Sequence, residues 1–229
     1  MTAIGILMLK TRFPRPPGDI GNPATWPFPV RYAVVEPATV ARVVNPEPPF
    51  DLLVEPFTAA AEELVAAGCA AITTSCGFLV LLQAALAARL PVPVATSSLL
   101  QVPLLQAALG PGRRVGIISI HAERLSRRHL AAAGVAADTP VVGTEGGREL
   151  TRVILADAPE LDTAAAEADV LAAGEALIDK APEVAAVVLE CTNMAPYAAA
   201  LAAHIGRPVY DIVDLVNWLH AGLAPRRWG

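Results

Sequence analysis

The 229-residue chain repeats one succession of segments twice. In the first half, Cys76 follows a short apolar run and lies 17 positions before Pro93, which opens a Pro-Val run. In the second half, Cys191 follows a similar run and lies 17 positions before Pro208, which opens another. A repeat of about 110 residues is too long for a solenoid unit and predicts two similar lobes.

Short apolar runs bounded by proline, glycine and polar residues predict strands that alternate with helices. Strands are expected at 3–9, 31–36, 70–74, 92–95, 114–118, 141–142, 186–189 and 209–212. Helices are expected at 57–67, 77–89, 97–109, 121–133, 146–157, 163–181, 195–205 and 214–221. This alternation predicts an α/β fold with two pseudo-symmetric lobes, each a parallel sheet flanked by helices.

The repeat also predicts where the functional site lies. We expect residues 1–98 and 209–229 to form an N-terminal lobe that carries Cys76, and residues 99–208 to form a C-terminal lobe that carries Cys191. In open parallel sheets a ligand binds beyond the carboxyl ends of the strands, and both cysteines lie at that end. The sequence therefore predicts an active site in the cleft between the lobes.

Composition restricts the partners. The formal net charge of −5 argues against nucleic acid and anionic membrane surfaces, and no apolar run reaches the roughly 18 residues of a membrane span. The apolar segment 4–9 lacks the basic flank of a signal peptide, so we expect a cytoplasmic protein. Three scattered cysteines and four histidines without ligand spacing predict no metal, and a homo-oligomer is left open.

The two repeated cysteines suit acid–base chemistry. Each precedes a predicted helix, whose N-terminus would lower the pKa of the thiol from about 8.5 toward neutrality. With a small-molecule carboxylate or carbonyl substrate between the lobes, one thiolate removes a proton and the opposite thiol delivers one to the other face, without a cofactor. Cys69 has no repeat partner, and we expect it in the core, where free cysteine acts as a small hydrophobic residue.

The strand-end cysteines and the Cys191-Thr192 pair resemble the aspartate/glutamate/hydantoin racemase superfamily over nearly the whole chain. The resemblance implies a cofactor-independent racemase or epimerase with Cys76 and Cys191 as its acid/base pair and Thr192 in contact with substrate oxygens. Its substrate would be an amino acid such as aspartate or glutamate, or a hydantoin-like compound. Gly77 and Glu190 depart from the residues that usually flank the two cysteines in the acidic amino-acid racemases, so the choice of substrate stays open.

Two alternatives also stay open. Maleate cis–trans isomerases of the same superfamily keep both cysteines and use one as a nucleophile, which would be Cys76 here. A non-catalytic module that binds a small molecule, with structural cysteines, is the other. Arylmalonate decarboxylases keep only the second cysteine, so the presence of Cys76 argues against that reaction.

Further residues are candidates for substrate binding because they flank the cysteines, end a strand or lie in the proline-rich segment 11–30, which we expect to be an ordered flap over the site. These candidates are Asn22, Ser75, Gly77, Phe78, Ser119, Thr192 and Asn193. Substrate contact is left open for Arg12, Arg15, Asp19, Thr144, Glu145 and Asp211.

Overall fold

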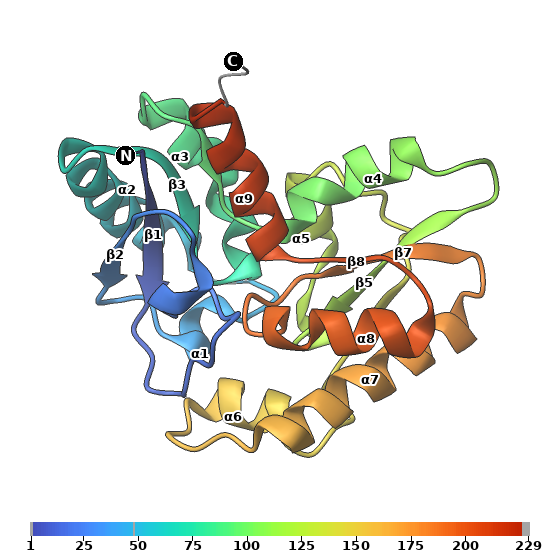
Figure 1. The fold of residues 1–229 in the computed structure, drawn as a ribbon. Coiled ribbons are helices and arrows are strands. Elements are labelled where there is room, and N and C mark those ends of the chain that lie inside the picture. The colour runs from blue at the N-terminus through green and yellow to red at the C-terminus, as the bar shows by residue number, and fades with distance from the viewer. Residues whose placement is uncertain (1, 48, 226–229) are drawn as a thin grey trace.

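The computed structural model describes residues 2–47 and 49–225, and their strands form two four-stranded parallel sheets (Figure 1). The first sheet has the order β2-β1-β3-β4 and the second the order β6-β5-β7-β8. The strands are β1 (Ala3–Leu9), β2 (Val30–Val35), β3 (Cys69–Thr74), β4 (Val94–Ala95), β5 (Arg114–Ser119), β6 (Val141–Gly143), β7 (Val184–Leu189) and β8 (Val209–Tyr210).

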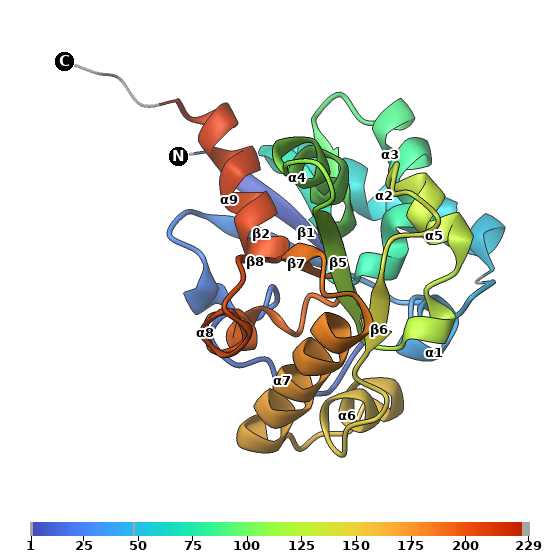
Figure 2. The ribbon, with the colours of Figure 1, turned by 90° about the vertical axis from the view of Figure 1, so that its right-hand side faces the viewer.

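Helices flank both sheets. The α-helices are α1 (Val40–Val43), α2 (Phe50–Ala66), α3 (Gln83–Arg89), α4 (Val102–Ala108), α5 (Arg127–Ala132), α6 (Leu150–Ala156), α7 (Thr163–Lys180), α8 (Ala198–Ile205) and α9 (Ile212–Leu223). The 3-10 helices are η1 (Pro23–Thr25), η2 (Gly77–Leu82), η3 (Ser98–Gln101), η4 (Ala122–Arg124) and η5 (Ala195–Tyr197). Figure 2 shows α7 and α8 side by side on one flank of the second lobe.

The two sheets repeat each other in detail, which confirms the predicted fold class. The strand order is the same in both, and all strand pairs are parallel. The register of β1 against β3 shifts after Ala3, and the register of β5 against β7 shifts at the matching place, after Arg114. The division of the chain at 98/99 and 208/209 stays a prediction, and β8 pairs with β7 in the second sheet.

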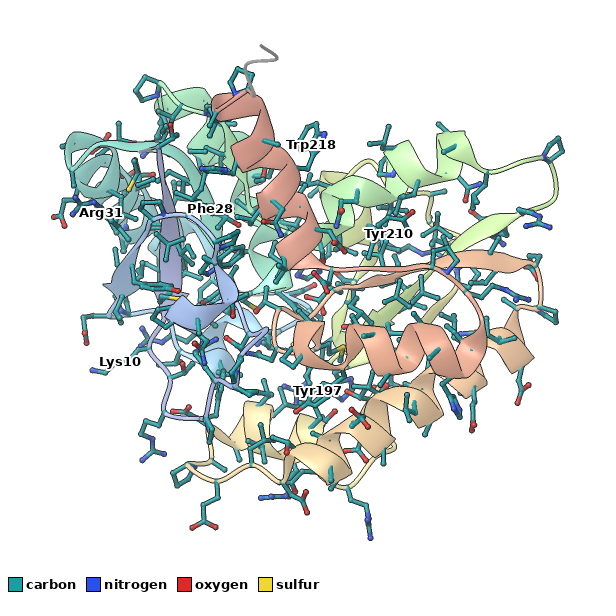
Figure 3. The ribbon with its side chains drawn as sticks, in the orientation of Figure 1. Lys10, Phe28, Arg31, Tyr197, Tyr210 and Trp218 are labelled. Carbon is teal, nitrogen blue, oxygen red and sulfur yellow. The ribbon has the colours of Figure 1, made fainter. Side chains whose placement is uncertain are left out.

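Helix α9 packs against the first sheet, although it follows the last strand of the second. Its Ile212 lies in one apolar cluster with Ile4 and Ile6 of β1. The ring of Phe28, from segment 11–30, stacks on His220 of α9 with 3.8 Å between the ring centroids. Figure 3 marks Phe28 in this region, so the proline-rich segment is ordered by packing against the closing helix.

The helix boundaries differ from the sequence prediction in three ways. Helix α2 begins at Phe50 and continues through Pro56, although proline usually ends a helix. The carbonyl that loses its partner belongs to Leu52, which is 73% exposed, so water can satisfy it. The predicted helices 77–89, 97–109, 121–133 and 195–205 each begin instead with a 3-10 turn, and α1 was not predicted.

A glycine in the central strand of each sheet lets a helix approach closely. A Cβ at Gly5 would lie 2.6 Å from Ile72 and 3.0 Å from Leu64 of α2. A Cβ at Gly116, the matching residue of β5, would lie 2.8 Å from Leu177 of α7. Both lobes therefore use the missing side chain to pack a helix directly on the strand.

Gly5→Val and Gly116→Val should each lower the free energy of unfolding by about 1–3 kcal/mol, because the added methyl groups overpack a filled core. Urea denaturation monitored by circular dichroism measures this loss. Gly222→Ala in α9 is the control, because nothing lies within 4 Å of its added Cβ, and it should raise stability by up to about 1 kcal/mol. Unchanged midpoints for both valine variants would contradict the packing account.

Candidate active site

The structure brings Cys76 and Cys191 to the same cavity. Cys76 is the second residue after β3, and Cys191 is the second residue after β7, so the two thiols come from equivalent ends of the two sheets. Both side chains line one small cavity at the carboxyl ends of the strands, where the lobes meet.

This cavity has apolar walls and is nearly filled. The apolar lining residues are Leu9, Phe13, Val40, Val44, Phe78, Ile120 and Ile154. The volume of about 10 Å³ has room for about one water molecule. Helices α1 and α6 come from different lobes, contact each other and contribute Val40 and Ile154 to the cavity lining.

Burial determines the acid–base state of both thiols. It raises the pKa of Cys76 and the pKa of Cys191 far above the ordinary range, and a charge on the neighbouring Glu190 raises both further. Backbone N–H groups of η2 face the Cys76 sulfur and offset part of this rise. The expected lowering of the thiol pKa is therefore wrong for the closed cavity, because loss of water outweighs the short 3-10 turn.

A chain of hydrogen bonds sets the orientation of Asn193 beside Cys191. Oδ2 of the buried Asp19 accepts from Asn193 Nδ2 at 2.6 Å, while Oδ1 accepts from Arg15 Nη1 at 2.8 Å and from the Gly21 N–H at 2.7 Å. A carboxylate without a proton only accepts, so Asn193 turns its carbonyl oxygen toward Cys191. The Cys191 S–H donates to that oxygen at 3.5 Å, which holds this cysteine in the thiol form.

Glu190, which precedes Cys191, is a fully buried carboxyl group at the cavity. Its Oε2 accepts from Ser119 Oγ at 2.8 Å, and its Oε1 has no hydrogen-bond partner among the described residues. Burial raises the pKa of Glu190 to about 7. Sequence reasoning treated this residue only as a departure from the family pattern, although a carboxyl group at the end of the apolar run 184–189 was a usable signal.

Two buried hydroxyl groups, of Thr192 and Ser98, link the lobes near the cysteines. Thr192 Oγ1 donates to the Ser75 carbonyl at 2.7 Å, and Ser98 Oγ donates to the Leu189 carbonyl at 2.6 Å. Ser75 Oγ accepts from the Leu9 N–H at 2.9 Å. Ser75 and Thr192 both line the cavity, as does Phe78, but the two hydroxyl groups already have protein partners.

Three other residues that were predicted to contact substrate do not line the cavity. Asn22 caps η1 through the Ala24 N–H and donates to the Arg15 carbonyl. From the same segment, Phe13 lines the cavity and Asp19 binds the lining residue Asn193. Ser119 bonds to Glu190 and is not part of the cavity lining. Gly77 is also outside the lining and lies against the Glu190 carboxyl group.

The residues whose substrate contact was left open have partners elsewhere, apart from Arg15 and Asp19. These partners are Asp157 for Arg12, Thr151 for Thr144, the Ala122 N–H for Glu145 and the Val213 N–H for Asp211. None of these four candidates lines the cavity. Their side chains support loops and helix ends around the site.

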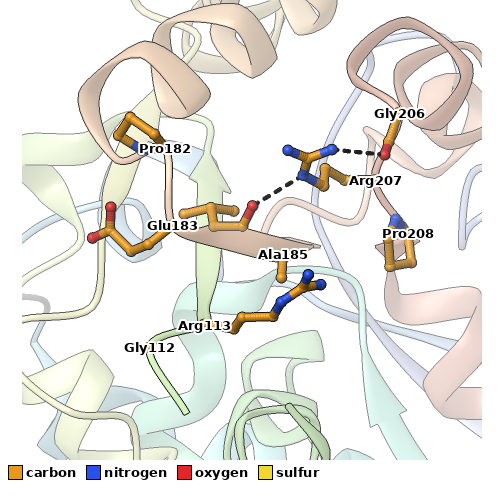
Figure 4. A pocket seen from close by; sticks show the side chains of 9 residues that line it. Gly112, Arg113, Pro182, Glu183, Ala185, Gly206, Arg207 and Pro208 are labelled. Atoms are coloured by element: carbon orange, nitrogen blue, oxygen red, sulfur yellow. Dashed lines mark hydrogen bonds between the residues drawn. The ribbon is translucent and has the colours of Figure 1, made fainter. Parts of the chain in front are cut away.

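Larger hollows lie away from the thiols, and two of them bear on the choice of site. One, of about 340 Å³, is at the amino ends of the second-sheet strands, where Arg207 donates to the Val184 and Gly206 carbonyls (Figure 4). The other is an apolar groove of about 600 Å³ beside α9, bordered by Tyr210 and the exposed Trp218, which Figure 3 labels. Neither contains a cysteine, so neither competes with the small cavity as the acid–base site.

In residues 2–47 and 49–225, no group of three or more His, Cys, Asp or Glu side chains could hold a metal ion. No helix within these ranges has the length and apolar character that a membrane crossing requires.

A family model described as Asp/Glu/Hydantoin racemase matches residues 97–219, which is more than half of the chain. The chain therefore belongs to the Asp/Glu/hydantoin racemase family, as its cysteines and strand pattern predicted.

Curated relatives of this chain carry the name dimethylsulfoniopropionate lyase. The relative from Durusdinium sp. clade D is 27% identical over 96% of this chain and 74% of its own length. Dimethylsulfoniopropionate lyase 5 of Emiliania huxleyi is 28% identical over 96% of this chain, which spans only 45% of that protein.

Solved structures share the fold. A mutant of arylmalonate decarboxylase with bound sulfate has a TM-score of 0.66 and 18% identity, covering 99% of this chain and 97% of that one. Glutamate racemase from Bacillus anthracis has a TM-score of 0.55 and 14% identity, covering 96% of this chain and 82% of that one. Racemases and a decarboxylase therefore share this two-lobed architecture.

Asp19→Asn should lower the free energy of unfolding by about 2–3 kcal/mol, because it leaves the Arg15 cation, whose side chain is only 13% exposed, without its charged partner. It also places two amide groups against each other at Asn193, so hydrogen exchange in segment 11–30 should become faster. Glu36→Gln breaks the exposed Lys10–Glu36 pair and should cost less than about 1 kcal/mol. Equal losses in both variants would contradict the role of Asp19 in anchoring this segment.

Proposed function

We propose that this chain is an enzyme that moves a proton at a carbon next to a carboxylate or carbonyl, with Cys76 and Cys191 as opposed acid/base thiols. The reaction is racemisation or epimerisation and uses no cofactor. The observation that carries this proposal is that equivalent ends of the two sheets present their thiols to one cavity. Membership of the racemase family supports it.

Both cysteines are thiols in the closed cavity, and their surroundings favour different roles. The Cys191 S–H donates to Asn193, whereas backbone N–H groups of η2 make Cys76 the thiol that loses its proton to give the base. The Cys76 thiolate takes the α-proton, and the electron pair of that C–H bond moves into the carboxylate or carbonyl. The Cys191 S–H then protonates the opposite face and becomes the thiolate. Proton exchange with water restores the resting state.

The apolar cavity increases the strength of these bases. A carbon acid has a far higher pKa than an ordinary thiol, so its proton moves more readily to a thiolate that water does not stabilise. Burial raises the pKa of both cysteines because it removes the water that would stabilise their thiolates. Closure of α1 against α6 would exclude water during the reaction.

The lining also favours one class of substrate. No lysine or arginine is among the residues that line the cavity in the described part of the chain, and Arg15 is already paired with Asp19. Aspartate or glutamate would bring a second carboxylate into this apolar space, where no lining cation pairs with it. A hydantoin-like compound or a monocarboxylate with an apolar substituent fits better.

Elimination is the second candidate, favoured by relatives that are named dimethylsulfoniopropionate lyases and match 96% of this chain. It would begin with the same α-proton removal. The electron pair would then form a Cα–Cβ double bond as the Cβ–S bond breaks, and neutral dimethyl sulfide would leave with acrylate. Elimination needs only one base, so it makes less use of the paired thiols than racemisation does.

Cys76→Ala and Cys191→Ala should each lower the rate of racemisation by at least about 10³-fold, because a two-base reaction loses its proton acceptor on one face or its donor on the other. The assay uses single enantiomers of aspartate, glutamate and 5-benzylhydantoin, followed by polarimetry and by α-deuterium exchange in proton NMR. Cys69→Ala is the matched control, because this buried cysteine does not line the cavity. Racemisation at the wild-type rate in either of the first two variants would contradict the proposal.

A second assay of the wild type and the same variants distinguishes elimination from racemisation. With dimethylsulfoniopropionate as substrate, elimination should give dimethyl sulfide and acrylate in equal amounts, measured by gas chromatography and NMR. At least one of the two cavity variants should retain part of this activity, because only one thiol acts as the base. Absence of both products in the wild type would exclude this candidate. A stable adduct on Cys76 with maleate, found by mass spectrometry, would favour the nucleophilic isomerase instead.

A further inference from the structure

The mechanism above leaves the buried carboxyl group of Glu190 without a role. This group lies at the cavity with both thiols, and a charge on it would raise the pKa of Cys76 and the pKa of Cys191. A carboxyl group so close to two bases affects the protonation of the whole site.

The two carboxyl oxygens of Glu190 differ in their surroundings. Oε2 is occupied by the Ser119 hydroxyl at 2.8 Å, whereas Oε1 is buried and has no hydrogen-bond partner among the described residues. Buried polar atoms without a partner are rare and costly in folded proteins. The free oxygen therefore marks a place where a ligand group would complete the site.

The position of Gly77 shows where that oxygen lies. A Cβ at this residue would overlap Oε1 of Glu190, so the carboxyl group of the second lobe rests on the backbone directly after Cys76. The free oxygen thus lies at the junction of the lobes, beside the turn that carries the first thiol.

Charge balance decides the protonation state. A reacting site would hold one thiolate and one substrate carboxylate, and no cation is among the lining residues within the described ranges. A third negative charge in the same buried space would be unpaired. Glu190 must therefore be neutral during the reaction, and burial raises its pKa to about 7, in agreement with this requirement.

We propose that protonated Glu190 is a further catalytic residue, whose Oε1–H donates a hydrogen bond to the carboxylate of the substrate. This inference rests on the proposed function and selects monocarboxylates whose α-carbon faces the thiols. The bond strengthens as negative charge builds on the carboxylate during removal of the α-proton. A neutral carboxylic acid can replace a cation in this way because it supplies a donor without adding charge.

This role gives the site a definite pH dependence. The donor is present below pH 7 and disappears as Glu190 ionises above it. The titratable groups that face it are the thiols of Cys76 and Cys191, and both titrate well above this range. The Ser119 hydroxyl and the Ile120 N–H stabilise the ionised form, so Ser119→Ala should move the loss of the donor to higher pH.

The test uses propionate, which has the carboxylate and carbon chain of dimethylsulfoniopropionate but no leaving group. Calorimetry should show binding to the wild type that weakens roughly 30-fold between pH 6 and pH 8.5, with uptake of close to one proton at the higher pH. Glu190→Gln keeps an N–H donor that does not titrate, so its affinity should change less than about threefold. Glu36→Gln, a surface control, should behave as the wild type does.

Constant affinity in the wild type, the same weakening in Glu190→Gln, or no binding to the wild type would overturn the proposal. Carbon-13 NMR of the Glu190 carboxyl group in the wild type gives a second readout, which does not depend on the folding of a variant. An ionisation near pH 4.5 would also overturn it. Because propionate binding needs no turnover, failure to exchange α-protons would reject the proposed function without deciding this inference.

Discussion

Hydrogen bonds between the lobes hold the two cysteines at one place. Thr192 donates to the Ser75 carbonyl, and Ser98 donates to the Leu189 carbonyl, so the strand ends that carry Cys76 and Cys191 are tied directly to each other. Both bonds are buried. They add direction to the apolar core cluster that runs through both lobes, with Leu7 of the first sheet and Val187 of the second in the same cluster.

Burial at the junction of the lobes has two opposite effects on the ionisable groups there. A closed apolar cavity makes each thiolate a stronger base, but it also makes any unpaired charge expensive. Asp19 satisfies this condition by pairing with Arg15 and binding Asn193, which in turn holds the proton of Cys191. Glu190 has no such cation, and burial keeps it largely neutral up to about pH 7.

The repeat in the sequence predicted the sheets well because strand-end cysteines and apolar runs are local signals. It also brought Cys76 and Cys191 together correctly. The contacts of segment 11–30 were less predictable, because turn preferences do not show that Asp19 reaches Asn193, 174 positions away, while Asn22 caps its own turn. The thiol pKa was misjudged because sequence shows a helix start but not the depth of burial.

The sharpest test of opposed thiols follows the solvent hydrogen rather than the rate. One enantiomer of a substrate that the enzyme converts is incubated with the enzyme in deuterated water, and the reaction is stopped early. The thiol that removes the α-proton carries the hydrogen of the substrate, whereas the thiol that protonates the other face carries deuterium. The account predicts deuterium in the inverted product and almost none in the recovered starting enantiomer. Equal deuterium in both from the first time points would mean that a single base serves both faces, and would contradict the two-thiol site.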